Sequence, residues 1–139
     1  MIVLDTNVLS ELMRKSPNEP VVQWMDTQPD PSLFTTTVTQ AEILYGVSLL
    51  PTGKRKQALA AAVDAMFEED FKGRVLPFDG PAAAAYAGIC ADRVHLGRPI
   101  SQFDAQIAAI ACSRGAALAT RNTPDFDACG IHVIDPWQA

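Results

Sequence analysis

A chain of 139 residues, with 48% hydrophobic and 19% charged residues, has the size and composition of one globular domain. This composition excludes a disordered chain, and no uncharged stretch is long enough to span a membrane. The net charge of −5 excludes a broad basic face for nucleic acid, so a polyanionic substrate would need a bound cation to draw its phosphates in.

The first half of the chain alternates short apolar runs with helical patterns. Ile2-Val3-Leu4 predicts a buried strand that starts the fold, and the carboxylate of Asp5 argues against a signal peptide. The elements predicted in this half are a strand over 2–4, a helix over 7–15, a short helix from Val21, a strand over 33–36, a helix opened by Thr39 and ended by Pro51, and a long amphipathic helix over 54–72.

The second half continues the same alternation. The predicted elements are a strand over 75–78, a helix from the N-cap Asp79 to about Leu96, a helix opened by Ser101 and ended by Gly115, and strands over 116–120 and 131–134. Short buried strands that alternate with helices are typical of βαβ units. The sequence therefore predicts an α/β fold, in which helices cover both faces of a parallel sheet.

The cysteines and histidines give little evidence of a metal site. Cys90, Cys112 and Cys129 are odd in number and widely spaced, so we expect reduced thiols that pack as small hydrophobes in a cytoplasm. His95 and His132 belong to no zinc-binding motif, and a structural role is expected for both.

Several oxygen-bearing side chains follow predicted strands or open predicted helices. Ligands in open α/β sheets bind beyond the carboxyl ends of the strands, where these side chains are expected to meet. They are Asp5 after the first strand, Glu42 and Asp104 in the first turns of two helices, and Asn122 and Asp125 after the strand that ends at Thr120. Such hard ligands suit Mg²⁺ or Mn²⁺, which commonly serve phosphoryl chemistry.

Helix capping explains the same acids without a metal ion. Thr39-x-x-Glu42 and Ser101-x-x-Asp104 both have the spacing of a capping box, and residues 122–125 fit a plain turn. Asp5 is harder to explain in this way, because a charge at the end of an apolar strand needs a partner to offset its desolvation. The residues alone leave both interpretations open.

Four motifs, in order along nearly the whole chain, resemble the PIN-domain family, and most of all the VapC-type toxins of bacterial toxin–antitoxin systems, including the plasmid-stability branch. They are Met1-Ile2-Val3-Leu4-Asp5-Thr6-Asn7, Thr39-x-x-Glu42-x-x-x-Gly46, Gly97-Arg98-Pro99-Ile100-Ser101-x-x-Asp104-x-x-Ile107-Ala108 and Thr120-Arg121-Asn122-x-x-Asp125-Phe126. The resemblance implies a single domain over 1–139, built as a three-layer α/β/α sandwich with a mainly parallel sheet. It also implies an endoribonuclease that needs Mg²⁺ or Mn²⁺ and uses a metal-activated water.

The resemblance also assigns roles to individual residues. It implies that Asp5, Glu42 and Asp104 are catalytic and hold the metal, with Asn122 at a position where many relatives carry Asp. Supporting roles are implied for Thr6, Thr120 and Asp125, and Arg98 and Arg121 are candidate phosphate contacts. For Arg14, Lys15 and the run 54–56, a charged helix end is the preferred explanation over a role in steering RNA.

The resemblance further implies three partners: RNA, a small VapB-type antitoxin and a second copy of the chain. A homodimer is expected, or a hetero-oligomer with the antitoxin, and no membrane is involved. The antitoxin is expected to lie in a groove against the first two helices and the helix from Lys54, with Leu9, Leu12, Met13 and Trp24 partly exposed in the free protein.

Two other functions remain open at this point. A haloacid-dehalogenase-like phosphatase also begins with a strand and an Asp, but that family needs a second acid two residues on, where this chain has Asn7. A catalytically idle module that only binds RNA or a partner is the other alternative, because Asn122 puts a second metal in doubt.

Overall fold

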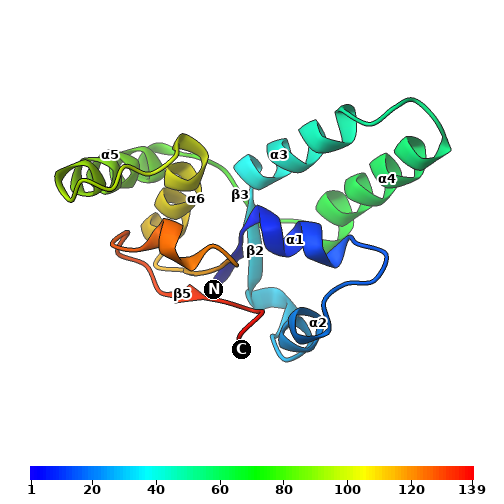
Figure 1. The fold of residues 1–139 in the computed structure, drawn as a ribbon, viewed down its shortest axis with the longest axis horizontal. Helices are drawn as coiled ribbons and strands as arrows, with labels where there is room; N and C mark the ends of the chain where they lie inside the picture. The colour runs from blue at the N-terminus through cyan, green and yellow to red at the C-terminus, as the bar shows by residue number, and fades with distance from the viewer.

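A computed structural model describes all 139 residues, and its centre is a five-stranded parallel sheet (Figure 1). The strands are β1 (Ile2–Leu4), β2 (Leu33–Thr36), β3 (Val75–Leu76), β4 (Ala117–Ala119) and β5 (Val133–Ile134). Their order across the sheet is β3-β2-β1-β4-β5, and every neighbouring pair is parallel. The prediction of an α/β fold with a parallel sheet is confirmed.

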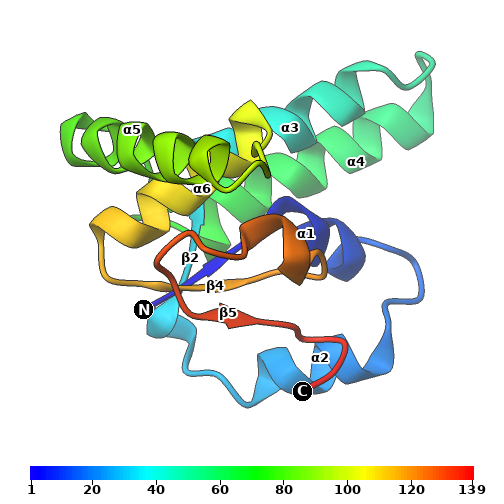
Figure 2. The same ribbon diagram turned by 60° about the vertical axis from the view of Figure 1, so that its left-hand side comes forward.

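Helices cover both faces of the sheet. They are α1 (Thr6–Leu12), α2 (Glu19–Asp26), α3 (Thr37–Ser48), α4 (Lys54–Ala65), α5 (Gly80–His95) and α6 (Gln102–Ser113), and two 3₁₀ turns lie at Asp30–Ser32 and Thr123–Phe126. Helices α5 and α6 lie on one side, and α1, α2 and α4 on the other (Figures 1 and 2). No helix combines the length and the apolar character needed to cross a bilayer.

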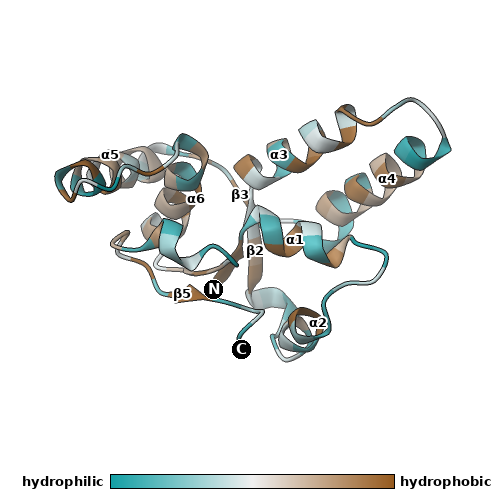
Figure 3. Ribbon diagram, viewed as in Figure 1, coloured by the Kyte–Doolittle hydropathy of each residue, from teal (hydrophilic) through white to brown (hydrophobic).

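Two separate cores result from the alternation of side chains along the strands. On β1, Val3 packs with α5 and α6, while the next residue, Leu4, packs with α1, α2 and α4. Leu118 and Ala119 divide in the same way on β4. In Figure 3 the helices carry both hydrophobic and hydrophilic segments. The two cores lie on opposite faces of the sheet, so the sheet is the middle of three layers, as the resemblance implies.

The predicted long helix over 54–72 is the clearest departure from expectation. Helix α4 ends at Ala65, and residues 66–70 form a π-helical turn in which the amide of Phe71 donates to the Met66 carbonyl at 3.0 Å. Phe67 and Phe71 are both buried. The wider turn thus seats two large rings in the core before the chain turns at Gly73, whose φ is +74°.

The chain order of the strands places a crevice beside β1. From β1 the chain builds β2 and β3 on one side, then returns across the sheet to build β4 and β5 on the other. Chains of this kind bind ligands beyond the carboxyl ends of the strands, where the direction of building reverses. In this molecule that point is occupied by the residues that follow β1, β2 and β4.

Candidate functional site

Asp5 lies at the carboxyl end of the central strand and is 4% exposed. Its Oδ1 accepts the Thr6 amide at 2.8 Å, and its Oδ2 accepts the Thr120 hydroxyl at 2.8 Å and the Asn7 amide at 3.2 Å. The pKa of Asp5 is raised to about 6, chiefly by burial and also by the charges of Asp104 and Glu42, while the bonds from Thr120 and Thr6 oppose the shift. The carboxylate is well hydrogen-bonded but still lacks a positive partner.

Thr6 and Glu42 connect β1 to α3. The Thr6 hydroxyl donates to Glu42 Oε1 at 2.8 Å and lies 3.1 Å from the Thr39 hydroxyl. The capping-box interpretation of Thr39-x-x-Glu42 is wrong, because Thr36 caps α3 and its hydroxyl accepts the Thr39 amide at 3.0 Å. Glu42 is therefore in the second turn of the helix, and its carboxylate bonds across to Thr6 instead of reaching back to the helix start.

Asp104 is placed by the start of α6. Ser101 caps this helix and accepts the Asp104 amide at 3.3 Å, as predicted. Burial and the charge of Asp125 raise the pKa of Asp104, and the Ser101 hydroxyl and the charge of Arg93 lower it. The charge of Asp104 therefore interacts with those of Asp5 and Asp125.

Thr120 organises the loop that follows β4. In addition to donating to Asp5, its hydroxyl accepts the Asn7 side-chain amide at 3.2 Å and the Asn122 backbone amide at 3.1 Å. The oxygen of the Asn7 side chain accepts the Arg121 backbone amide at 3.1 Å. Asn7 was not among the predicted site residues, although it belongs to the first motif. A second carboxylate could not donate these amide hydrogen bonds, so this network argues against a phosphatase site of the haloacid-dehalogenase type.

The predicted arginines have partners of their own. Arg98 pairs with Asp127 at 2.9 Å, and both side chains are about half exposed or more. The Arg121 guanidinium lies 5.1 Å from the centre of the Trp137 ring. Both arginines therefore reach solvent close to the Thr120 loop, and neither forms a hydrogen bond or ion pair with Asp5, Glu42 or Asp104.

Arg93 is a buried cation that the sequence did not reveal. It is 4% exposed, and its guanidinium donates to the carbonyls of Arg98 at 2.7 Å, Asp125 at 2.8 Å and Asp127 at 3.0 Å. It thereby fastens the end of α5 to the loop that carries Asp125. This role could not be predicted from the sequence, because one arginine near the end of a helix is usually solvated.

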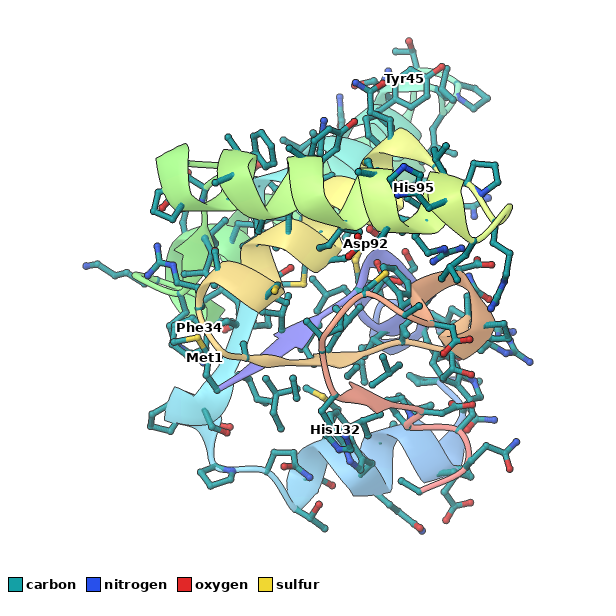
Figure 4. All side chains as sticks on the ribbon, turned by 90° about the vertical axis from the view of Figure 1, so that its left-hand side faces the viewer. Met1, Phe34, Tyr45, Asp92, His95 and His132 are labelled. Carbon is teal, nitrogen blue, oxygen red and sulfur yellow. The ribbon has the colours of Figure 1, made fainter.

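The predicted acids influence one another through their charges, but they do not converge on a single point. Asp5 interacts with Asp104 and Glu42, and Asp104 with Asp125. No three His, Cys, Asp or Glu side chains lie close enough to form a ready-made ion site. All three cysteines are free, and Figure 4 shows His95 on α5 and His132 beside β5. The donor set consists of oxygen atoms with an excess of negative charge, which fits a hard divalent cation.

Comparison with known proteins agrees with the motifs. The model of the PIN domain matches residues 2–129. The chain is 42% identical to plasmid stability protein StbB of Pseudomonas syringae pv. tomato over all of both chains, and 39% identical to VapC ribonuclease Y4jK of Sinorhizobium fredii over 99% of both. The crystal structure of FitAcB from Neisseria gonorrhoeae superposes with a TM-score of 0.94, at 41% identity and full coverage of both chains. A member of the VapBC family of toxin-antitoxin systems from Mycobacterium tuberculosis, VapBC-5, gives a TM-score of 0.71, at 27% identity over 95% of both chains.

Proposed function

This chain belongs to the PIN-domain family, and from that membership we propose that it is the ribonuclease toxin of a toxin–antitoxin pair, acting in the cytoplasm on RNA phosphodiester bonds with Mg²⁺ or Mn²⁺. The observation that carries the proposal is the buried carboxylate of Asp5, which interacts with two further acids and has no positive partner. A cation would offset the repulsion between these charges.

Asp5, Glu42 and Asp104 would hold the ion. When bound, it supplies a polarised water and stabilises the charge that develops on the phosphate oxygens. Thr6 orients Glu42 through its hydroxyl, and Thr120 and Asn7 orient Asp5. Asn122 and Asp125 lie on the neighbouring loop as supporting residues, and Arg98 and Arg121 lie near enough to that loop to meet flanking phosphates.

Metal removal tests this proposal directly. We expect the purified protein to cleave RNA with Mg²⁺ or Mn²⁺, and to lose at least about 100-fold of that rate in excess EDTA. Restoring Mg²⁺ should restore the rate, which gel electrophoresis of an end-labelled RNA measures. Equal cleavage in EDTA would contradict the metal role. Metal binding without cleavage of any cellular RNA would favour the idle binding module instead.

A groove on the helical side fits the expected antitoxin. It has a volume of about 490 Å³ and is lined mainly by apolar side chains of α1, α2, α4 and the π-helical turn, among them Leu9, Leu12, Met13, Met25, Ala62 and Met66. Leu12, Met13 and Trp24 are half-buried as expected, whereas Leu9 is only 1% exposed. We assign this groove to an apolar segment of a VapB-type antitoxin.

A second copy of the chain fits a different surface. Large apolar side chains are more than half exposed on α3, at the end of α5 and at the start of α6, which are neighbouring elements: Tyr45, Leu49, Val94, Leu96 and Phe103. Figure 4 shows Tyr45 projecting outward from the top of α3. This surface is our candidate for the homodimer interface.

The dimer proposal predicts a change of mass. We expect Tyr45→Lys with Leu49→Lys to convert a dimer into monomers, because each change buries a charge in an apolar contact. Sedimentation velocity measures the mass, and Gln57→Lys on the exposed face of α4 is the matched control. A monomeric wild-type protein, or a doubly substituted protein that stays dimeric, would overturn this interface.

A further inference from the structure

A second groove leads away from the acids between α1, α3 and α4. Its volume is about 850 Å³. Thr6 and Glu42 line one part of it, and Arg14, Lys15 and Arg55 line another. The groove therefore joins two residues of the candidate site to three cations, two from the turn after α1 and one from α4.

This concentration of positive charge stands out in an acidic protein. The chain has 11 basic and 16 acidic residues, yet Glu42 is the only acid that lines the groove. Arg14 is held in place, because its guanidinium donates to both carboxylate oxygens of Glu11 at 3.2 Å. Arg14, Lys15 and Arg55 are all exposed, and of the three only Arg14 forms an ion pair, so the charges of Lys15 and Arg55 are available to a ligand.

The dimensions of the groove suit an extended chain. Helix α1 forms one wall of the groove from Thr6 to its end at Leu12, about 9 Å at the rise of a helix, and Arg14 and Lys15 follow in the turn beyond it. On the α3 wall, a Cβ at Gly46 would meet no atom within 4 Å, so this side is open to solvent. No aromatic ring lines the groove. Recognition here would therefore rest on backbone charge and not on base stacking.

We propose that this groove holds the single-stranded RNA that flanks the scissile phosphate, with Arg14, Lys15 and Arg55 contacting its phosphates. The inference rests on the proposed ribonuclease function and adds to it the path of the substrate. It also goes beyond the sequence-based preference for a charged helix end, because the structure brings the cations that follow α1 and Arg55 of α4 into the same groove as Glu42.

Binding of a fluorescent single-stranded RNA, followed by anisotropy in Mg²⁺, tests the path. The measurements use Asp5→Asn protein so that the RNA stays intact. Arg55→Ala and Lys15→Ala should each raise Kd about 3- to 10-fold and reduce the slope of log K against log salt by about 0.7. Lys54→Ala is the matched control, because Lys54 is the exposed neighbour of Arg55 on α4 but does not line the groove. Its Kd should change less than about 2-fold.

A substitution in the α3 wall distinguishes RNA binding within the groove from a general attraction of RNA to exposed positive charge. Gly46→Glu places a carboxylate in the groove where a side chain has space, and should raise Kd at least about 10-fold. Gly46→Gln has nearly the same size without the charge and should raise Kd less. Equal binding by both variants and the wild-type residue would contradict the path.

The outcomes distinguish this inference from the function on which it rests. Suppose that the wild-type protein cleaves RNA, while Arg55→Ala and Lys15→Ala bind RNA as well as Lys54→Ala does. The proposed RNA path is then wrong, but the proposed ribonuclease function is retained. If these variants weaken only the complex with an antitoxin, the groove belongs to the protein partner and the path is likewise wrong. If the unchanged protein neither binds nor cleaves RNA, both proposals fail.

Discussion

Asp5→Asn is expected to abolish RNA cleavage, with a loss of at least about 100-fold, while the fold stays intact. The substitution keeps the size of the side chain and removes the charge that would hold a cation beside the phosphate. The new amide retains one oxygen acceptor, so part of the local network persists, while the bonds that Thr120 and Asn7 donate to Oδ2 of Asp5 have to rearrange. Cleavage of an end-labelled RNA in Mg²⁺ measures the effect.

The same substitution should stabilise the metal-free protein at neutral pH. The pKa of Asp5 rises from 3.8 to about 6 in the folded state. Between these values the folded protein keeps a proton that the unfolded chain releases, so the free energy of unfolding falls as the pH rises. This loss is complete above pH 6 and amounts to about 3 kcal/mol at most. Asn carries no charge, so the Asp5→Asn variant does not undergo this loss in the free energy of unfolding.

Thermal unfolding in EDTA at two pH values measures this second effect. At pH 7.5 the Asn variant should unfold about 5 to 10 °C above the wild-type protein, and at pH 4.5 the two should unfold together. Adding Mg²⁺ should narrow the gap at pH 7.5 by stabilising only the wild-type protein. Asp64→Asn, an exposed acid of α4, controls for net charge and should leave activity and unfolding unchanged. Retained cleavage in Asp5→Asn would remove Asp5 from the proposed site.

Arg93→Met is expected to lower the free energy of unfolding by about 3 to 5 kcal/mol. Methionine retains an apolar stem, but the carbonyls of Arg98, Asp125 and Asp127 lose their donor. A buried acceptor without a partner costs about 1 to 3 kcal/mol, and the sum is reduced where water reaches the loop. The sulfur of Cys129, 3.6 Å from the same guanidinium, loses a contact as well.

Urea unfolding of two arginine variants checks this expectation. Arg98→Met removes the ion pair between Arg98 and Asp127, in which the two side chains are 48% and 64% exposed. The free energy of unfolding should therefore change by less than about 0.5 kcal/mol. The two variants make the same chemical change a few residues apart and differ chiefly in burial. A loss below about 1 kcal/mol in Arg93→Met would show that water replaces the guanidinium at these carbonyls.

Most of the fold could be predicted from the sequence, because strands, helices and helix caps are indicated by local residue patterns. Strand residues 2–4 and 33–36 match the structure, and the caps Asp79 and Ser101 accept the predicted amides. The start of α3 was misplaced because Thr36 and Thr39 are both plausible caps. Only the packing, which buries Thr36 at the end of β2, decides between them. The π-helical turn likewise depends on how two phenylalanines fit a core that no local pattern describes.

The candidate site was predicted only in part, for the same reason. Asp5, Glu42 and Asp104 could be selected from their places beside strands and helix starts. The bond from Thr6 to Glu42 joins residues 36 positions apart, and the bonds of Arg93 also span up to 36. Such contacts are properties of the assembled layers. The groove at Arg55 belongs to this class too, because α1 and α4 meet only in the folded molecule.

The central position of β1 also determines when the candidate site can form during synthesis. Asp5 is made early in translation, but its hydrogen-bond partner Thr120 follows 115 residues later, and β4 must join β1 before the two meet. At about 5 to 20 residues per second, synthesis of that stretch takes roughly 6 to 23 s. During this interval a nascent chain has the residues of β1 and β2 but not those of β4 and the Thr120 loop, so the surroundings of Asp5 are completed only when translation is nearly over.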